Sequence, residues 1–108
     1  MKIKDLETTL KFNPVQGEYE NLDLMGAYTS DLLSDVMANA PAQSVLITIQ
    51  AHKNTVAVAT LVEIKAIVLC NDRIPEDEMV SAAKAEGIAI FTTKENQFNT
   101  SCQIGALL

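Results

Sequence analysis

The chain has 108 residues, a net charge of −6 and a pI of about 4.6. This length suits one domain, so we expect residues 1–108 to fold as a unit, and 48% hydrophobic residues are enough to form a core. The acidic balance argues against partners that are bound through clustered Lys and Arg. Neither nucleic acid nor an anionic membrane surface is therefore expected.

The amino terminus and the cysteines indicate a cytoplasmic protein. MKIKDLETT lacks the apolar core of a signal peptide, and no apolar run reaches the roughly 20 residues of a membrane span. Cys70 and Cys102 form no CxxC pair, and the chain has one histidine, so we predict neither a metal site nor a cofactor. Both cysteines lie in apolar segments, which favours buried free thiols.

The first part of the chain contains one predicted helix and one predicted strand. Its elements in order are a helix over 3–11, a short extended piece near Val15, a polar loop over 17–23 and a strand over 24–28. Ser30 then suits the N-cap of a second helix, with Asp31 in the first turn. The spacing of Leu32, Leu33, Val36 and Met37 predicts the buried face of that helix.

The segment 55–65 fits either a strand or a helix. TVAVATLVEIK alternates in part, but it also suits a helix capped by Asn54. A strand over 66–70 follows with no turn residue between, so we predict a helix. Because this helix is apolar nearly all round, it should be buried on two sides, beneath neighbours or in a subunit interface.

Two further βα units complete the chain. Pro75 suits the first turn of a helix that ends at Gly87, and 88–91 reads as a strand. Thr92 and Glu95 form a T-x-x-E capping box for a last helix, on which Phe98, Cys102 and Gly105 share one face. Met25, Met37 and Met79 are expected in the core.

The alternation of strands and helices predicts a three-layer α/β/α domain with a mainly parallel sheet of about four strands. Strands such as VLITI, AIVLC and IAIF are continuously apolar, as in sheets covered on both faces. The chain contains no P-loop, no G-x-G-x-x-G and no G-x-S-x-G motif. We therefore expect a protein without enzymatic activity, a small enzyme being the weakest alternative.

The carboxyl ends of parallel strands form the edge at which α/β sheets bind ligands. Four polar segments precede helices there, and helix N-termini attract anions, which Lys53, Arg73 and Lys94 would favour further. The predicted ligand-binding residues at this edge are Ser30, Asp31, Gln50, His52, Asn54, Thr92 and Thr93. No catalytic residue is assigned.

Four of these residues also have a simpler explanation. Ser30, Asn54 and Thr92 are good N-caps and need be nothing more. His52 is explained by a ligand or interface contact, by a solvated loop, or by catalysis with Asp31 as its partner.

The segments DLLSDVMANA and ITIQAHKNTVAVATL, with GIAIFTT near the end, resemble small stand-alone DRTGG-domain proteins. That family is similar to the N-terminal domain of HPr kinase/phosphorylase. The resemblance implies an α/β/α domain without a kinase module, in a family whose members occur alone, beside pairs of CBS domains, or attached to enzymes such as phosphate acetyltransferase. The segment that corresponds to the naming motif reads Asp23-Leu24-Met25-Gly26-Ala27 and lacks the arginine.

Two functions follow as hypotheses. The first is a non-catalytic regulatory or sensory domain that binds a small anionic metabolite or nucleotide at the carboxyl edge. The second is a protein-interaction module that forms a homo-oligomer, a dimer being favoured, or that docks on a metabolic enzyme through the helix at 55–65.

Overall fold

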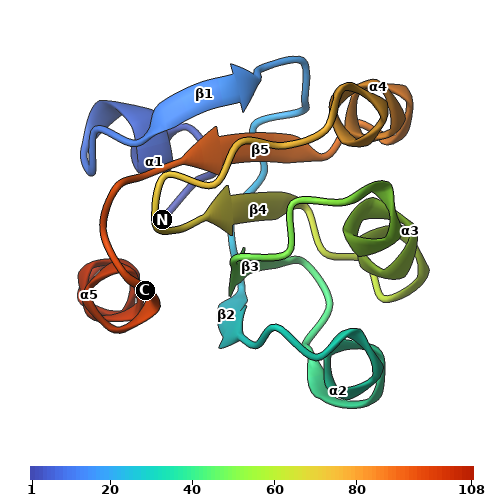
Figure 1. Ribbon diagram of the computed structural model, residues 1–108. Helices are drawn as coiled ribbons and strands as arrows, with labels where there is room; N and C mark the ends of the chain where they lie inside the picture. Colours follow the sequence, from blue (N-terminus) through green and yellow to red (C-terminus); the bar gives the residue numbers. More distant parts are fainter.

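The computed structural model describes residues 1–108 and contains one five-stranded sheet between two layers of helices (Figure 1). The predicted α/β/α architecture is confirmed, with one strand more than expected. The strands are β1 (Asn13–Gln16), β2 (Gly26–Thr29), β3 (Ser44–Thr48), β4 (Ala66–Leu69) and β5 (Ala89–Thr92). The helices are α1 (Asp5–Thr8), α2 (Leu33–Asn39), α3 (Lys53–Leu61), α4 (Asp77–Glu86) and α5 (Gln97–Gly105).

The strand order is β1-β5-β4-β3-β2. β2, β3, β4 and β5 run parallel, as the alternation of elements predicted. The additional strand is β1, which pairs antiparallel with β5 so that Asn13 lies opposite Thr92 and Pro14 opposite Phe91. The extended piece expected near Val15 is thus an edge strand of the same sheet.

Each face of the sheet has its own hydrophobic core, because successive side chains of a strand point to opposite faces. Leu46 and Ile67 belong to the core beneath α2, α3 and α4. Val45 and Val68 belong to the core that includes residues of α1 and α5. Figure 1 shows α2, α3 and α4 on one face of the sheet and α1 and α5 on the other.

The ambiguous segment 55–65 contains the helix that was predicted. α3 packs between α2 and α4, and two of its own side chains, Val56 and Ala59, are buried. Flanking helices on two sides explain why the segment is apolar nearly all round. Leu61, at its last turn, is nevertheless 71% exposed.

α4 ends as predicted and begins later than predicted. Gly87 is its C-cap in the left-handed conformation (φ 67°), which glycine adopts without steric cost. The helix starts at Asp77 with Glu76 as N-cap, so Pro75 precedes the first turn. The first helix is also shorter than expected, because α1 covers only Asp5–Thr8.

Several side chains expected in the core are exposed, namely Met25, Leu32, Met37, Phe98 and Cys102. In α5 the buried side chains are Thr100 and Ile104, so the face predicted from Phe98, Cys102 and Gly105 points outward. The prediction failed because two apolar stripes of one helix are equivalent until a sheet covers one of them. Val36, Met79 and Cys70 are buried as expected.

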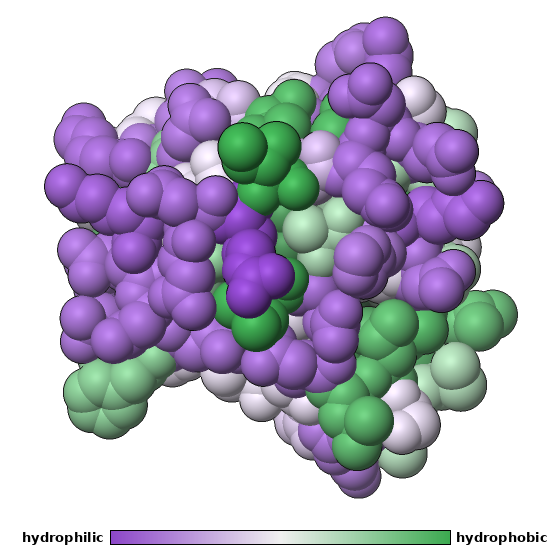
Figure 2. Space-filling view, viewed as in Figure 1, coloured by the Kyte–Doolittle hydropathy of each residue, from purple (hydrophilic) through white to green (hydrophobic).

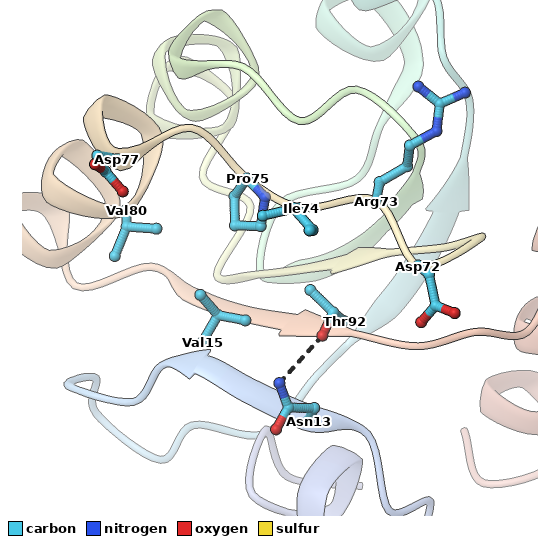
Figure 3. Close-up of a pocket in the computed structure, with 9 residues that line it drawn as sticks. All are labelled: Asn13, Val15, Asp72, Arg73, Ile74, Pro75, Asp77, Val80 and Thr92. Carbon is cyan, nitrogen blue, oxygen red and sulfur yellow. Dashed lines mark hydrogen bonds between the residues drawn. The ribbon is translucent and has the colours of Figure 1, made fainter.

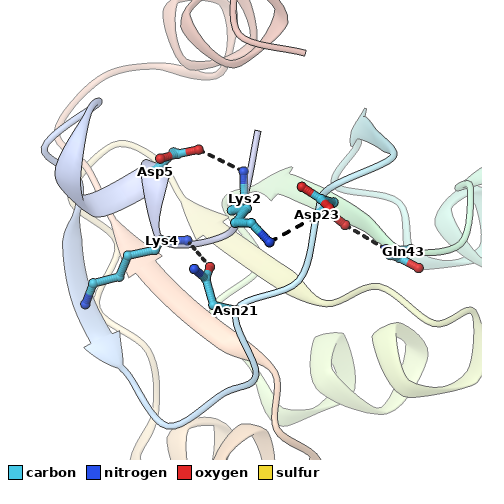
Figure 4. A network of polar contacts seen from close by, with 6 residues as sticks. All are labelled: Lys2, Lys4, Asp5, Asn21, Asp23 and Gln43. Carbon is cyan, nitrogen blue, oxygen red and sulfur yellow. Dashed lines mark hydrogen bonds and ion pairs between the residues drawn. The ribbon is translucent and has the colours of Figure 1, made fainter.

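The amino-terminal segment is tied to the sheet by polar contacts (Figure 4). The Lys4 amide donates to Asn21 Oδ1 at 2.9 Å, and Lys2 Nζ lies 3.9 Å from Asp23 Oδ2. Gln43, next to β3, donates to the Asp23 carbonyl at 2.8 Å. Asp23, the acid of the segment that corresponds to the family motif, therefore holds the amino terminus beside the start of β3. None of the five helices has the length and apolarity that crossing a membrane requires.

Candidate functional site

The carboxyl edge of the sheet contains two neighbouring hollows, next to the strand-to-helix connections. The first, called the His52 hollow, has a volume of about 360 Å³ and is lined by Ile49, Gln50, Ala51, His52, Arg73, Ile74 and Glu76. The second, called the Thr92 hollow, has a volume of about 450 Å³ (Figure 3). Its lining consists of Asn13, Val15, Asp72, Arg73, Ile74, Pro75, Asp77, Val80 and Thr92.

The connection from β4 to α4 separates the two hollows, because Arg73 and Ile74 line both of them. Asn71 and Asp72 have positive φ values of 58° and 53°, a conformation that Asn and Asp tolerate better than most residues. Their amides donate to carbonyls of the β5–α5 connection at 3.0 Å. This backbone turn presents Ile74 with 86% of its surface exposed.

Of the three cations expected at this edge, Arg73 lines both hollows, whereas Lys53 and Lys94 line neither. It forms no ion pair, whereas Lys53 Nζ lies 3.1 Å from Glu78 Oε2. Figure 3 shows the Arg73 side chain extending away from Asn13 and Thr92. The guanidinium thus leaves the Thr92 hollow and, since it also lines the His52 hollow, belongs with that one.

His52 stands at the start of α3 and faces the start of α4. Its Nδ1 atom lies 3.5 Å from Glu76 Oε1, and both side chains are more than half exposed. An exposed pair of this kind contributes little to stability. Its imidazole is bonded to no hydroxyl or thiol that it could activate, and Asp31 is not its partner, because the Asp31 carboxylate is bonded elsewhere. The pairing of His52 with Asp31 considered from the sequence is wrong.

Asp31 and Gln50 form a latch within the protein. Asp31 Oδ1 accepts hydrogen bonds from Thr48 Oγ1 at 2.9 Å, from the Ile49 amide at 2.9 Å and from Gln97 Nε2 at 3.0 Å. Gln50 Nε2 donates to the Asp31 carbonyl at 2.9 Å. These bonds join β3, the β2–α2 connection and α5, so the two residues hold the edge together.

The other predicted site residues do not converge on one place. Ser30 Oγ accepts from the Leu32 amide at 3.2 Å, and Thr93 Oγ1 accepts from the Glu95 amide at 3.2 Å, so both are turn formers. Thr92 Oγ1 lines the Thr92 hollow and accepts from Asn13 Nδ2 at 3.3 Å. Asn54 lines a groove between α3 and α4.

The capping roles expected from the sequence are wrong. Ser30 lies before α2, whose N-cap is Leu32, and Asn54 is inside α3, whose N-cap is His52. The Thr92–Glu95 capping box does not form, since β5 continues through Thr92.

The N-cap of α5 is Asn96 instead. Its side chain accepts the Asn99 amide at 2.8 Å. The motif T-x-x-E was present, but cap assignment depends on where the preceding strand stops, and pairing with β4 and β1 decides that.

The residues of the two hollows that were not predicted include Asn13, Val15, Ile74 and Glu76. Asn13 and Val15 reach the edge only because β1 pairs with β5, and the local sequence holds no signal for that pairing. Ile74 follows the Asn-Asp-Arg segment that was predicted to lie at the edge, so the run of turn-forming residues was the available signal for it.

No protein-family model matches the chain, and no curated protein matches it either. A solved structure that does match comprises the CBS and DRTGG domains of the regulatory region of a Clostridium perfringens pyrophosphatase, complexed with its activator, diadenosine tetraphosphate. The TM-score is 0.72 at 13% sequence identity, over 94% of this chain and 45% of that one. This chain thus spans less than half the length of the matched chain. The likeness confirms, at the level of the fold, the resemblance to DRTGG-domain proteins that the sequence predicted.

Proposed function

We propose that this protein is a non-catalytic regulatory domain that binds a small phosphate-bearing ligand, such as a nucleotide, in the His52 hollow. The observation that carries the proposal is Arg73, a cation without an ion pair that lines a hollow at the carboxyl edge of a parallel sheet. An unpaired guanidinium matches the geometry of phosphate oxygens. The structural neighbour, a regulatory region complexed with a dinucleotide activator, supports the same class of function.

The surroundings of Arg73 suit an anion that carries an apolar group. His52 lies at the rim with its Nδ1 atom 3.5 Å from Glu76 Oε1, the one carboxylate of the lining. The first N–H groups of α3 have no acceptor within the helix. Ile49 and Ile74 supply apolar surface beside the cation. Asp31 is removed from the proposed binding set, because its Oδ1 is occupied by three donors of the protein.

Isothermal titration calorimetry against a panel of nucleotides that includes diadenosine tetraphosphate tests the proposal. An Arg73→Gln variant should bind at least about tenfold more weakly, the effect of one lost charge-assisted hydrogen bond. The matched control is Lys84→Gln, which removes the same charge near the end of α4, at the opposite edge of the sheet. Absence of binding by the wild-type protein, or equal affinities of Arg73→Gln and wild type, would contradict the proposal.

A protein-interaction role is the second candidate, and the groove between α3 and α4 favours it. This groove has a volume of about 570 Å³, and its apolar wall includes Ala57, Leu61, Ala82 and Ala85. Under this alternative the domain docks on a partner enzyme through α3. A Leu61→Lys variant would then lose the regulatory effect on that enzyme while it kept nucleotide affinity. The Arg73→Gln variant would lose nucleotide affinity and keep the effect on the enzyme.

A further inference from the structure

We infer that two copies of this chain associate through the outer edge of β2, with their β2 strands antiparallel about a two-fold axis. β2 lies at the end of the sheet and has a neighbour on one side only, β3. Figure 1 shows α5 and α2 on either side of β2 and no element beyond it. The outer main-chain groups of Gly26–Thr29 accept or donate no hydrogen bond within the chain. Such an edge is a template for another strand.

The opposite edge of the sheet carries two devices against pairing that β2, a strand of four residues, lacks. β1 contains Pro14, which has no N–H to donate, and its register is irregular between Pro14 and Gln16. Proline and bulges are devices that prevent pairing at an edge. β2 has neither a proline nor a bulge in its pairing with β3. Its four residues, GAYT, carry no charge, so lysine does not block the edge either.

The charge pattern favours a second copy as the partner. The chain has a net charge of −6, so two copies repel each other over most of their surfaces. The run from Leu24 to Ser30 contains no charged residue. The nearest acids beyond it are held by internal contacts, Asp23 with Lys2 and Asp31 in the latch. A third acid, Asp35 of α2, accepts the Tyr28 hydroxyl at 2.8 Å. The acids next to this edge are thus bonded within the chain, and the strand itself brings no charged side chain opposite its copy.

A two-fold axis also pairs the apolar ends of the strand. Met25, just before β2, is 72% exposed, and Leu32, after it, is 64% exposed. In an antiparallel pair the first residue of one strand lies beside the last residue of the other. The Met25 end of one copy is therefore brought beside the Leu32 end of the second, twice by symmetry. Figure 2 shows apolar side chains gathered on the surface over α2, next to this edge.

Sedimentation velocity of the full chain, at concentrations up to about 1 mM, tests the inference. Wild type should dimerise, and Met25→Lys should weaken dimerisation at least tenfold because it places a charge at both ends of the interface. Leu61→Lys is the matched control, since Leu61 is 71% exposed but lies on α3, and it should change dimerisation less than twofold. Circular dichroism must show that both variants are folded.

A second measurement needs no variant. Amide hydrogen exchange of wild type should show protection within residues 26–29 that rises with protein concentration. A monomer at every concentration, protection that does not change with concentration, or a Met25→Lys protein that still dimerises like wild type would overturn the inference. A dimer that is lost in Leu61→Lys alone would place the interface on α3 and would also overturn it.

Discussion

Removal of the Asp31 carboxylate should destabilise the protein more than any other change of a polar side chain at the carboxyl edge. Its Oδ1 accepts three hydrogen bonds, from Thr48 Oγ1, the Ile49 amide and Gln97 Nε2, at 2.9, 2.9 and 3.0 Å. The Asp31→Ala variant leaves the fully buried Thr48 hydroxyl without an acceptor and unties α5 from β3. A hydrogen bond to a charged group contributes about 1.5–3 kcal/mol, and an orphaned buried group costs about 1–3 kcal/mol.

These contributions overlap, so we expect Asp31→Ala to lower the free energy of unfolding by about 2–4 kcal/mol. That is a large fraction of the roughly 5–15 kcal/mol of a typical domain. Urea denaturation followed by circular dichroism measures the change as a lower midpoint with an unchanged slope. Asp31→Asn keeps an acceptor oxygen in place and should lose about half as much.

The neighbouring Ser30→Ala variant is the control for this experiment. Ser30 Oγ accepts one hydrogen bond from the Leu32 amide at 3.2 Å at the surface, and its loss should cost less than about 1 kcal/mol. A loss in Asp31→Ala no greater than that in Ser30→Ala would refute the latch. Asp31 would then be free for a ligand, as the sequence suggested.

The cysteines should differ in reactivity, because Cys70 is buried and Cys102 exposed, and burial raises the pKa of the Cys70 thiol. A thiol reagent should therefore label one cysteine per native chain and both in denaturant; rapid labelling of Cys70 in the native protein would contradict this burial. Hydrogen bonds, first that from Asn39, lower the pKa of the Asp35 carboxyl. Because the folded-state pKa lies below the unfolded one, this stabilisation is complete above about pH 4 and is lost as the pH falls through the folded-state pKa. The difference in free energy of unfolding between wild type and Asp35→Asn, measured by urea denaturation, should accordingly shrink below pH 4. A difference that stays constant to pH 2 would show that Asp35 stabilises the protein through packing and not through its charge.

The fold was predictable where the pattern is strong and local. Continuous apolar strands such as β3 and β4, separated by amphipathic helices, specify a covered parallel sheet whatever the rest of the chain does. Gly87 was identified as a helix end because few other residues adopt its φ of 67° without strain. The helical state of 53–61 was inferred from the absence of Gly, Pro, Asn or Asp before β4, but the structure does contain a turn there, with Glu63 at a φ of 61°.

The candidate site was predicted as a region and not as a set of residues. The carboxyl edge holds two hollows, as parallel topology requires, and Arg73 lies there as expected. Asp31 and Gln50 are in the right place but are bonded to the protein. Whether a polar side chain at an edge faces a ligand or a neighbouring loop depends on partners far away in sequence, such as Gln97.

The sequence by itself determined the order of strands and helices, their parallel arrangement and the edge at which their polar connections meet, because periodicity and turn chemistry are local properties. Only the tertiary structure decided that β1 joins the sheet antiparallel beside β5, that α5 buries Thr100 and Ile104, and that β2 is left as an open edge. These outcomes depend on which surfaces remain uncovered after the central strands have paired. Long-range packing selects among alternatives that are equivalent in the local sequence.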